Sequence, residues 1–123
     1  LEDFLVSNWD RTPLAREYEI FTENGEVCGQ QFRTDTGPID ILGQRKDKSE
    51  FLVVELKRDR ASDVVVGQTL RYMGWIKEHL CAPNQNVTGC IIAQRKDPKL
   101  DYALKQVNSI QFLKYEVDFR LIA

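Results

Sequence analysis

Two short apolar segments that carry acidic residues constrain this chain most. Asp40 stands in the first segment, 39–42, and Glu55 and Lys57 stand in or just after the second, 51–56. Both segments are typical of β-strands, in which successive side chains point to opposite faces. Alternation puts Asp40 on the face opposite its isoleucine neighbours, and Glu55 and Lys57 on one shared face. These groups meet only if the two strands pair, so the pattern predicts a local fold and a site together.

The three polar residues suit metal-assisted cleavage of a phosphodiester bond. Mg²⁺ prefers oxygen ligands, and one or two carboxylates, here Asp40 and Glu55, are enough to bind it. The metal acts as a Lewis acid and lowers the pKa of the attacking water, while Lys57 holds or deprotonates that water. The alternative is a strand-end acid and an exposed Glu-Lys pair on an edge strand. Because 51–54 looks like a buried strand, charges at its end would be costly to bury without partners or metal.

Composition places the chain among ordinary globular domains. Its 123 residues fit one domain, with 42% hydrophobic and 29% charged residues. A chain of this length buries roughly two thirds of the surface that its unfolded form exposes. The formal net charge is −2, whereas nucleic-acid-binding domains are more often clearly basic. Contact with DNA therefore has to come from a local patch.

The chain start and the cysteines set further expectations. No apolar run approaches the roughly 20 residues that span a bilayer, and no signal peptide is visible, so we expect a cytoplasmic protein without a membrane partner. Residue 1 is leucine, which leaves open whether the single domain 1–123 is excised from a longer protein. Cys28, Cys81 and Cys90 lack CxxC spacing, which favours buried or half-buried free thiols over zinc ligands. We expect His79 in the last turn of a helix.

Hydrophobic periodicity and turn residues predict an α/β fold with a mixed central β-sheet flanked by helices. The expected helices are 1–8, 64–80 with a cap at Ser62 or Asp63, and 98–107, and the expected strands are 17–21, 27–33, 39–42, 51–56, 87–93 and 110–115. A turn at Asn24-Gly25 lets 27–33 return as the partner of 17–21 in an antiparallel meander. The later strand-helix-strand connections favour parallel pairing.

The chain resembles the PD-(D/E)XK nuclease superfamily, with Asp40 as the first acid and Glu55-Leu56-Lys57 as the E-x-K half. Gln68-x-x-x-Tyr72 resembles the accessory motif of RecB-like members. The wider run 34–75 and the opening 1–5 are similar to the catalytic domain of the NucS endonuclease family. The resemblance covers nearly the whole chain and implies a restriction-endonuclease-like fold.

The resemblance also implies roles at the site. Asp40 and Glu55 would bind Mg²⁺ or Mn²⁺ with the Leu56 carbonyl, and Glu2 would bind the metal directly or through water. Lys57 would be the catalytic lysine. For Glu2 the alternative is a solvated acid at a helix start.

Two residues of the 64–80 helix are implicated as well. Gln68 would orient Lys57 or the nucleophile, and its i, i+4 spacing puts Tyr72 on the same helix face, toward the substrate backbone. The alternatives are a surface amide for Gln68 and a core aromatic for Tyr72. Trp75 could stack on a base, but a core tryptophan on the helix face is the favoured interpretation.

Basic residues outside the motif could line a phosphate-binding groove, although such charges are often only solvated. The candidates are Arg33, Arg58, Arg60 and Arg71, with Arg95 and Lys96 further along the chain.

Motif and resemblance together predict a Mg²⁺- or Mn²⁺-dependent DNA endonuclease that acts in DNA repair on single-stranded, branched or mismatched DNA. The family resembled carries an N-terminal DNA-binding and dimerising domain, so a homodimer or a missing N-terminal domain is expected. Two alternatives stay open. One is a non-catalytic nucleic-acid-binding or interaction module with a nuclease fold, and the other is a restriction or defence nuclease domain.

Overall fold

A mixed sheet of six strands organises the computed structural model, which describes residues 1–123. The strand order is β1-β5-β6-β8-β10, and β4 also pairs with β5. Pairing is antiparallel among β1, β4, β5 and β6, and parallel from β6 to β8 to β10, which confirms the predicted mixed sheet. The strands are β1 (Tyr18–Ile20), β4 (Gln30–Thr34), β5 (Gly37–Arg45), β6 (Glu50–Leu56), β8 (Asn86–Ala93) and β10 (Ile110–Lys114).

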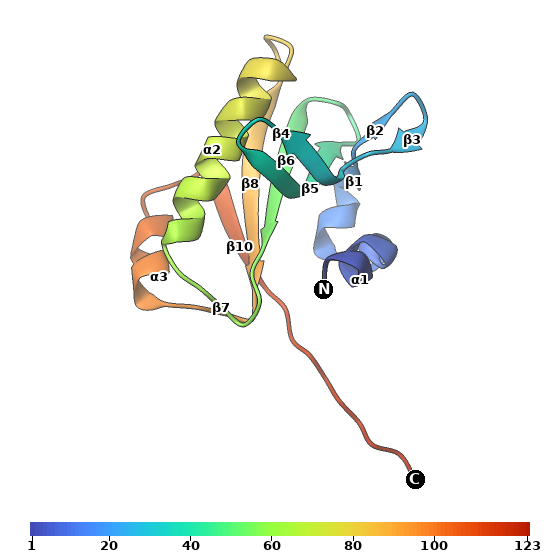
Figure 1. The fold of residues 1–123 in the computed structure, drawn as a ribbon, viewed down its shortest axis with the longest axis vertical. Coiled ribbons are helices and arrows are strands. Elements are labelled where there is room, and N and C mark those ends of the chain that lie inside the picture. The colour runs from blue at the N-terminus through green and yellow to red at the C-terminus, as the bar shows by residue number, and fades with distance from the viewer.

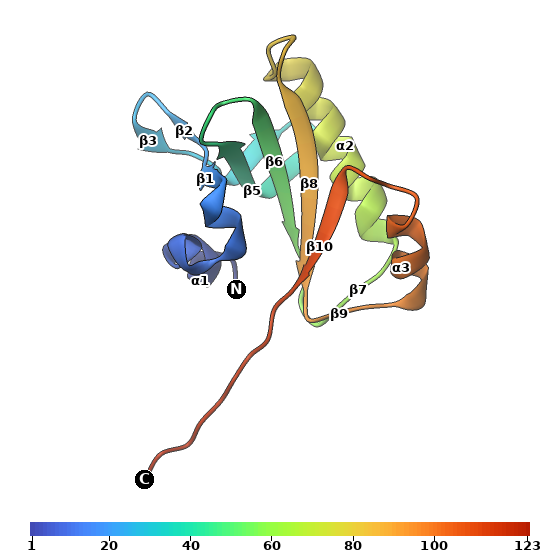
Figure 2. The ribbon, with the colours of Figure 1, turned by 180° about the vertical axis from the view of Figure 1, so that it is seen from behind.

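Helices flank the sheet on both sides. In Figure 1, α2 (Val64–His79) and α3 (Pro98–Leu104) lie along one face. Figure 2 shows α1 (Glu2–Ser7) and the turns that follow it at the other side, and the C-terminal segment after β10 extending away from the sheet. No helix has both the length and the apolar character needed to cross a membrane.

The central strand β6 is buried on both faces. Phe51 and Val53 pack in the cluster under α2, whereas Leu52 and Val54 pack in the cluster that Trp9 and its neighbours cover. A strand covered on both faces is apolar at nearly every position. Glu55 continues this strand and is therefore carried into the interior.

Helix α2 buries the predicted face, including Val65, Met73 and Ile76, and ends at His79, one residue before the predicted end and with His79 in its last turn as expected. The predicted side-chain cap is wrong. Asp63 is the N-cap residue but makes no capping hydrogen bond, and its φ of −64° and ψ of −18° are helical. A capping side chain needs an extended backbone at the N-cap, so the carboxylate of Asp63 cannot reach back to the first turn.

Segment 27–33 forms no strand ladder with 17–21 and meets it through the Cys28 N–H, which donates to the Phe21 carbonyl at 3.0 Å, so that part of the predicted meander is wrong. The turn at Asn24-Gly25 forms, but it joins only the two-residue strands β2 (Thr22–Glu23) and β3 (Glu26–Val27). Strands β1 and β4 instead share one edge of β5, with β1 at its C-terminal end and β4 at its N-terminal end. Strand β5 has nine residues, which is long enough to pair with both short strands.

Another short pairing was not predicted from the sequence. Strand β7 (Arg60–Ala61) pairs in parallel with β9 (Arg95–Lys96), just beyond the ends of β6 and β8. The three cysteines are free thiols, Cys90 buried and Cys28 and Cys81 half-buried, as predicted.

Close packing of α2 on β8 makes Gly89 sensitive to substitution. A Cβ at position 89 would lie 2.7 Å from Thr69 Cγ2 and 3.0 Å from Met73 Sδ. Gly89→Ala should therefore lower the free energy of unfolding by about 1–3 kcal/mol, the usual cost of overpacking. Gly67→Ala is the control, because nothing lies within 4 Å of a Cβ there. Denaturant unfolding of both variants checks this, and equal effects would contradict the packing.

Candidate active site

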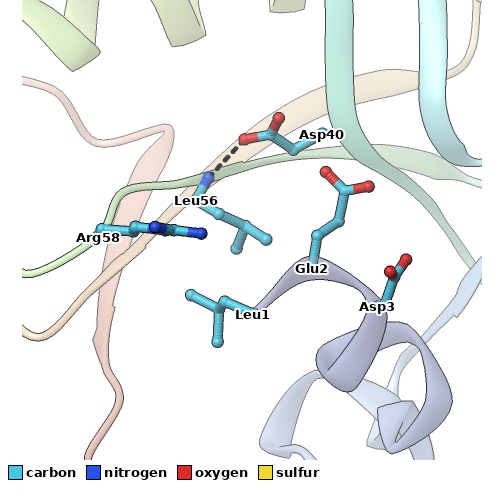
Figure 3. Close-up of a pocket in the computed structure, with 6 residues that line it drawn as sticks. All are labelled: Leu1, Glu2, Asp3, Asp40, Leu56 and Arg58. Carbon is cyan, nitrogen blue, oxygen red and sulfur yellow. Dashed lines mark hydrogen bonds between the residues drawn. The ribbon is translucent and has the colours of Figure 1, made fainter.

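The site forms where β5 and β6 separate. Their antiparallel ladder includes the pair Ile41 and Val54 but does not continue beyond it toward Asp40 and Glu55. A cavity of about 310 Å³ opens there, and Figure 3 shows its lining: Leu1, Glu2, Asp3, Asp40, Leu56 and Arg58. The pairing of the two strands on which the predicted site depends is therefore present.

Asp40 bridges the separated strands. Its Oδ2 accepts a hydrogen bond of 2.8 Å from the Leu56 backbone N–H, and Oδ1 accepts one of 3.3 Å from Gln31 Nε2. The predicted alternation around Asp40 is wrong, because Ile39 and Ile41 pack in opposite core clusters rather than on one face. The strand is irregular here: Gln31, which falls opposite Asp40 in the β4–β5 register, has a left-handed φ of 52°.

Glu55 is a buried carboxyl group, 4% exposed, and its Oε1 has no hydrogen-bond partner. Burial first, and the negative charge of Asp40 second, raise the pKa of Glu55 to about 8, while the charge of Lys57 opposes them. A buried acceptor without a partner beside a second carboxylate is costly unless a cation or proton compensates it. This orphaned oxygen fits a site for a hard divalent cation.

The acids do not form a group of three metal-binding side chains. No cluster of three or more His, Cys, Asp or Glu with that geometry occurs in the chain. One or two carboxylates suffice for Mg²⁺, which usually keeps several waters. Asp40 and Glu55 are thus compatible with a metal, and binding by Glu2, directly or through water, stays a prediction.

Glu2 is held beside Asp40 by two amides that the sequence did not point to. Gln30 Nε2 donates to Glu2 Oε2 at 2.8 Å and to Asp3 Oδ1 at 2.6 Å, and Gln31 Nε2 donates to Glu2 Oε1. Glu2 therefore lies in the cavity of Asp40 (Figure 3). A glutamine pair in a polar strand carries no sequence signal for this role.

Lys57 follows the site strand β6, whereas no hydrogen bond joins Gln68 to the site residues. Lys57 is half-buried, and its backbone N–H donates to the Ile92 carbonyl of β8 at 2.9 Å. Its charge acts on Glu55. Gln68 is half-buried on α2, and no hydrogen bond joins it to Lys57. Its orienting role stays a prediction.

Tyr72 is a core aromatic, 8% exposed, in the cluster between α2 and the sheet. Its hydroxyl lies so close to Gly37 that a Cβ there would be 2.8 Å away. Gly37 also has a φ of 121°, a conformation that disfavours other residues. Tyr72 therefore packs against the start of the strand that carries Asp40. The guanidinium of Arg71 stacks over its ring at 5.3 Å.

The basic residues that were candidates for phosphate binding fall into two groups, those without an ion pair that line a cavity and those paired with an acid. Arg58 is exposed, makes no ion pair and extends into the cavity from the side opposite Glu2 (Figure 3). Arg33 is exposed on β4 and lines a second, smaller cavity. Arg60 instead pairs with Asp97 at 3.9 Å, and Arg95 pairs with Asp59 at 3.0 Å.

Trp75 is a half-buried packing residue, which agrees with the favoured interpretation. Its ring meets Phe32 at 6.3 Å and His79 at 4.5 Å between centroids, and its Nε1 donates to Asp35.

A mixed sheet with helices on both sides, carrying an acid on one central strand and E-x-K at the end of the next, is the arrangement of the PD-(D/E)XK nuclease superfamily. The model of the endonuclease NucS C-terminal domain matches residues 11–119. The chain belongs to this family of RecB-like nuclease domains. The match begins after Glu2, so it does not bear on that residue.

Relatives share the fold over nearly the whole chain. The chain is 26% identical over 95 residues to endonuclease NucS of Methanocaldococcus jannaschii, which covers 77% of this chain and 35% of the relative. A repair endonuclease from Pyrococcus abyssi superposes with a TM-score of 0.71 at 23% identity, over 94% of this chain and 47% of that one. A structure described as an EndoMS–dsDNA complex superposes with a TM-score of 0.72 at 21% identity, over 96% of this chain and 44% of that one. These structures confirm the restriction-endonuclease-like fold class, and this chain spans less than half of each relative.

The buried Glu55 should make stability depend on pH in the presence of EDTA. Its folded pKa, about 8, lies above the ordinary 4.5. The folded state therefore holds the proton more tightly, and the stabilisation is complete below the unfolded pKa and lost as pH rises toward 8. Glu55→Gln should be more stable than the parent near pH 8, by on the order of 5 kcal/mol.

The two proteins should approach each other in stability as pH falls toward 4.5, the ordinary pKa of the carboxyl group. Denaturant unfolding across this pH range measures the difference. A difference that stays constant with pH would contradict the raised pKa of Glu55.

Proposed function

We propose that this chain is a Mg²⁺- or Mn²⁺-dependent DNA endonuclease domain that hydrolyses phosphodiester bonds. The observation that carries the proposal is the buried Glu55 oxygen without a partner, beside Asp40, which itself lines an open polar cavity. A structural acid pair of this kind would be a net cost to the fold. If the pair binds a cation, the positive charge compensates the two buried carboxylates, and the unfavourable burial instead favours cation binding.

Asp40 and Glu55, with the Leu56 carbonyl, would hold the cation. A bound divalent cation supplies Lewis-acid stabilisation of charge on the phosphate and lowers the pKa of a nearby water. Lys57 Nζ would donate to the attacking water or to a phosphate oxygen, and its position next to Glu55 keeps a positive charge at the reacting phosphate. Glu2 would bind the cation directly or through water from the same cavity, where Gln30 and Gln31 hold its two oxygens.

DNA is the substrate that the relatives support. One is described as a repair endonuclease and another as a complex with double-stranded DNA. We assign this chain a role in DNA repair, with single-stranded, branched or mismatched DNA as substrates. Because the chain spans less than half of these relatives, a further N-terminal domain or a homodimer would select among DNA structures.

Asp40→Ala and Lys57→Ala should each lower the rate of DNA cleavage at least about 100-fold, the usual range for loss of an acid-base or charge-stabilising group. Lys46→Ala removes an exposed lysine just beyond the C-terminal end of β5, away from Asp40, and should keep the parent rate. The assay uses single-stranded, flapped and mismatched DNA with Mg²⁺ or Mn²⁺, and EDTA should abolish cleavage. A chain that binds these DNAs but leaves all of them intact with either metal would be a binding module and not a nuclease.

Arg58 should contribute one phosphate contact. It is an unpaired charge in the cavity, so Arg58→Ala should weaken DNA binding and reduce the slope of log affinity against log salt by about 1. Arg45→Ala is the matched control, because Arg45 lies at the other end of β5 and pairs with Glu17. Fluorescence anisotropy with Ca²⁺ in place of Mg²⁺ measures both. Equal slopes for the two variants would remove Arg58 from the interface.

A further inference from the structure

Two consecutive glutamines on β4 reach the same carboxylate. Gln30 Nε2 donates to Glu2 Oε2 at 2.8 Å, and Gln31 Nε2 donates to Glu2 Oε1. Gln31 also reaches Asp40 Oδ1 at 3.3 Å. The side chain of Gln31 therefore links the acid of α1 to the acid of β5.

Regular strand geometry does not permit this arrangement. Successive side chains of a strand point to opposite faces, so two neighbouring residues cannot both reach one group on one face. The left-handed backbone of Gln31, with φ at 52°, breaks this alternation. The β4–β5 ladder pairs Gln30 with Ile41 and Phe32 with Ile39, so Gln31 and Asp40 lie between two ladder pairs, within reach of each other.

A glutamine is a poor residue for this backbone. Non-glycine residues with positive φ are uncommon outside Asn, Asp and His, and they persist at sites where the surrounding contacts hold them. Gln31 is exposed, so core packing does not hold it. The ladder pairs of Gln30 and Phe32 fix the backbone on either side of it, and its amide contacts Glu2 and Asp40.

We infer that Gln31 is a positioning residue of the metal site, which holds the carboxylate of Glu2 against Asp40 by a backbone conformation that glutamine does not favour. This inference rests on the proposed function. Gln30 supports it from the next position by tying Glu2 and Asp3 of α1 to β4. The strained strand thereby positions an acid from a distant part of the chain beside the metal ligand.

Two substitutions separate the amide from the backbone. Gln31→Gly removes the amide but adopts positive φ without strain, and Gln31→Ala removes the amide and keeps the strain. Both variants should bind Mn²⁺ about tenfold more weakly than the parent in calorimetry, as expected for loss of a group that orients a metal ligand. In EDTA, the glycine variant should have a higher Tm than the alanine variant. Gln111→Ala, an exposed glutamine on β10, should bind Mn²⁺ like the parent.

The coupling to Glu2 is tested in a Glu2→Ala background, where Gln31→Gly should cause no further loss of Mn²⁺ affinity. Parent affinity in Gln31→Gly would overturn the inference, because it would mean that only the backbone at position 31 matters. Additive losses in the double variant would overturn it as well. If the parent chain binds no Mn²⁺, the proposed function fails along with the inference. If the parent binds Mn²⁺ but no more tightly than Gln31→Gly does, only the inference fails.

Discussion

The site depends on one contact across the end of a separating ladder, where the carboxylate of Asp40 accepts the Leu56 N–H at 2.8 Å. This hydrogen bond joins β5 to β6 beyond their last backbone pair and places Asp40 next to the buried Glu55. Two carboxylates in such a place repel each other and are poorly solvated, which the fold tolerates only with a proton or a cation. The raised pKa of Glu55 and its orphaned oxygen are two consequences of the same geometry.

Burial of β6 makes this arrangement unavoidable. The strand has apolar side chains on both faces, so its last residues leave the core only after Glu55. On the opposite side of the cavity, α1 brings Glu2 to the site through Gln30 and Gln31, while Arg58 adds a positive charge. Acidic groups that would bind a cation and a basic group that would meet phosphate are thus combined in a chain of net charge −2.

The buried central strand and the meeting of the two acids could be predicted from the sequence, because both follow from the local periodicity of apolar residues. The apolar run of β6 predicted a buried strand, and the spacing of Asp40 and Glu55 predicted that pairing would bring them together. The edge position of β4 could not be predicted, because it depends on the length of β5 and not on the turn at Asn24-Gly25. The amide contacts of Gln31 could not be predicted from the sequence either. Nothing in a pair of neighbouring glutamines indicates a left-handed backbone or a partner 29 residues away.

The central claim is that Asp40 and Glu55 bind one divalent cation. Crystals of the chain soaked in Mn²⁺ and measured at a wavelength where manganese scatters anomalously test it directly. The account predicts an anomalous peak within about 2.5 Å of carboxylate oxygens of both residues. A peak elsewhere on the surface, or none at saturating Mn²⁺ with Glu55 still buried and without a partner, would contradict it.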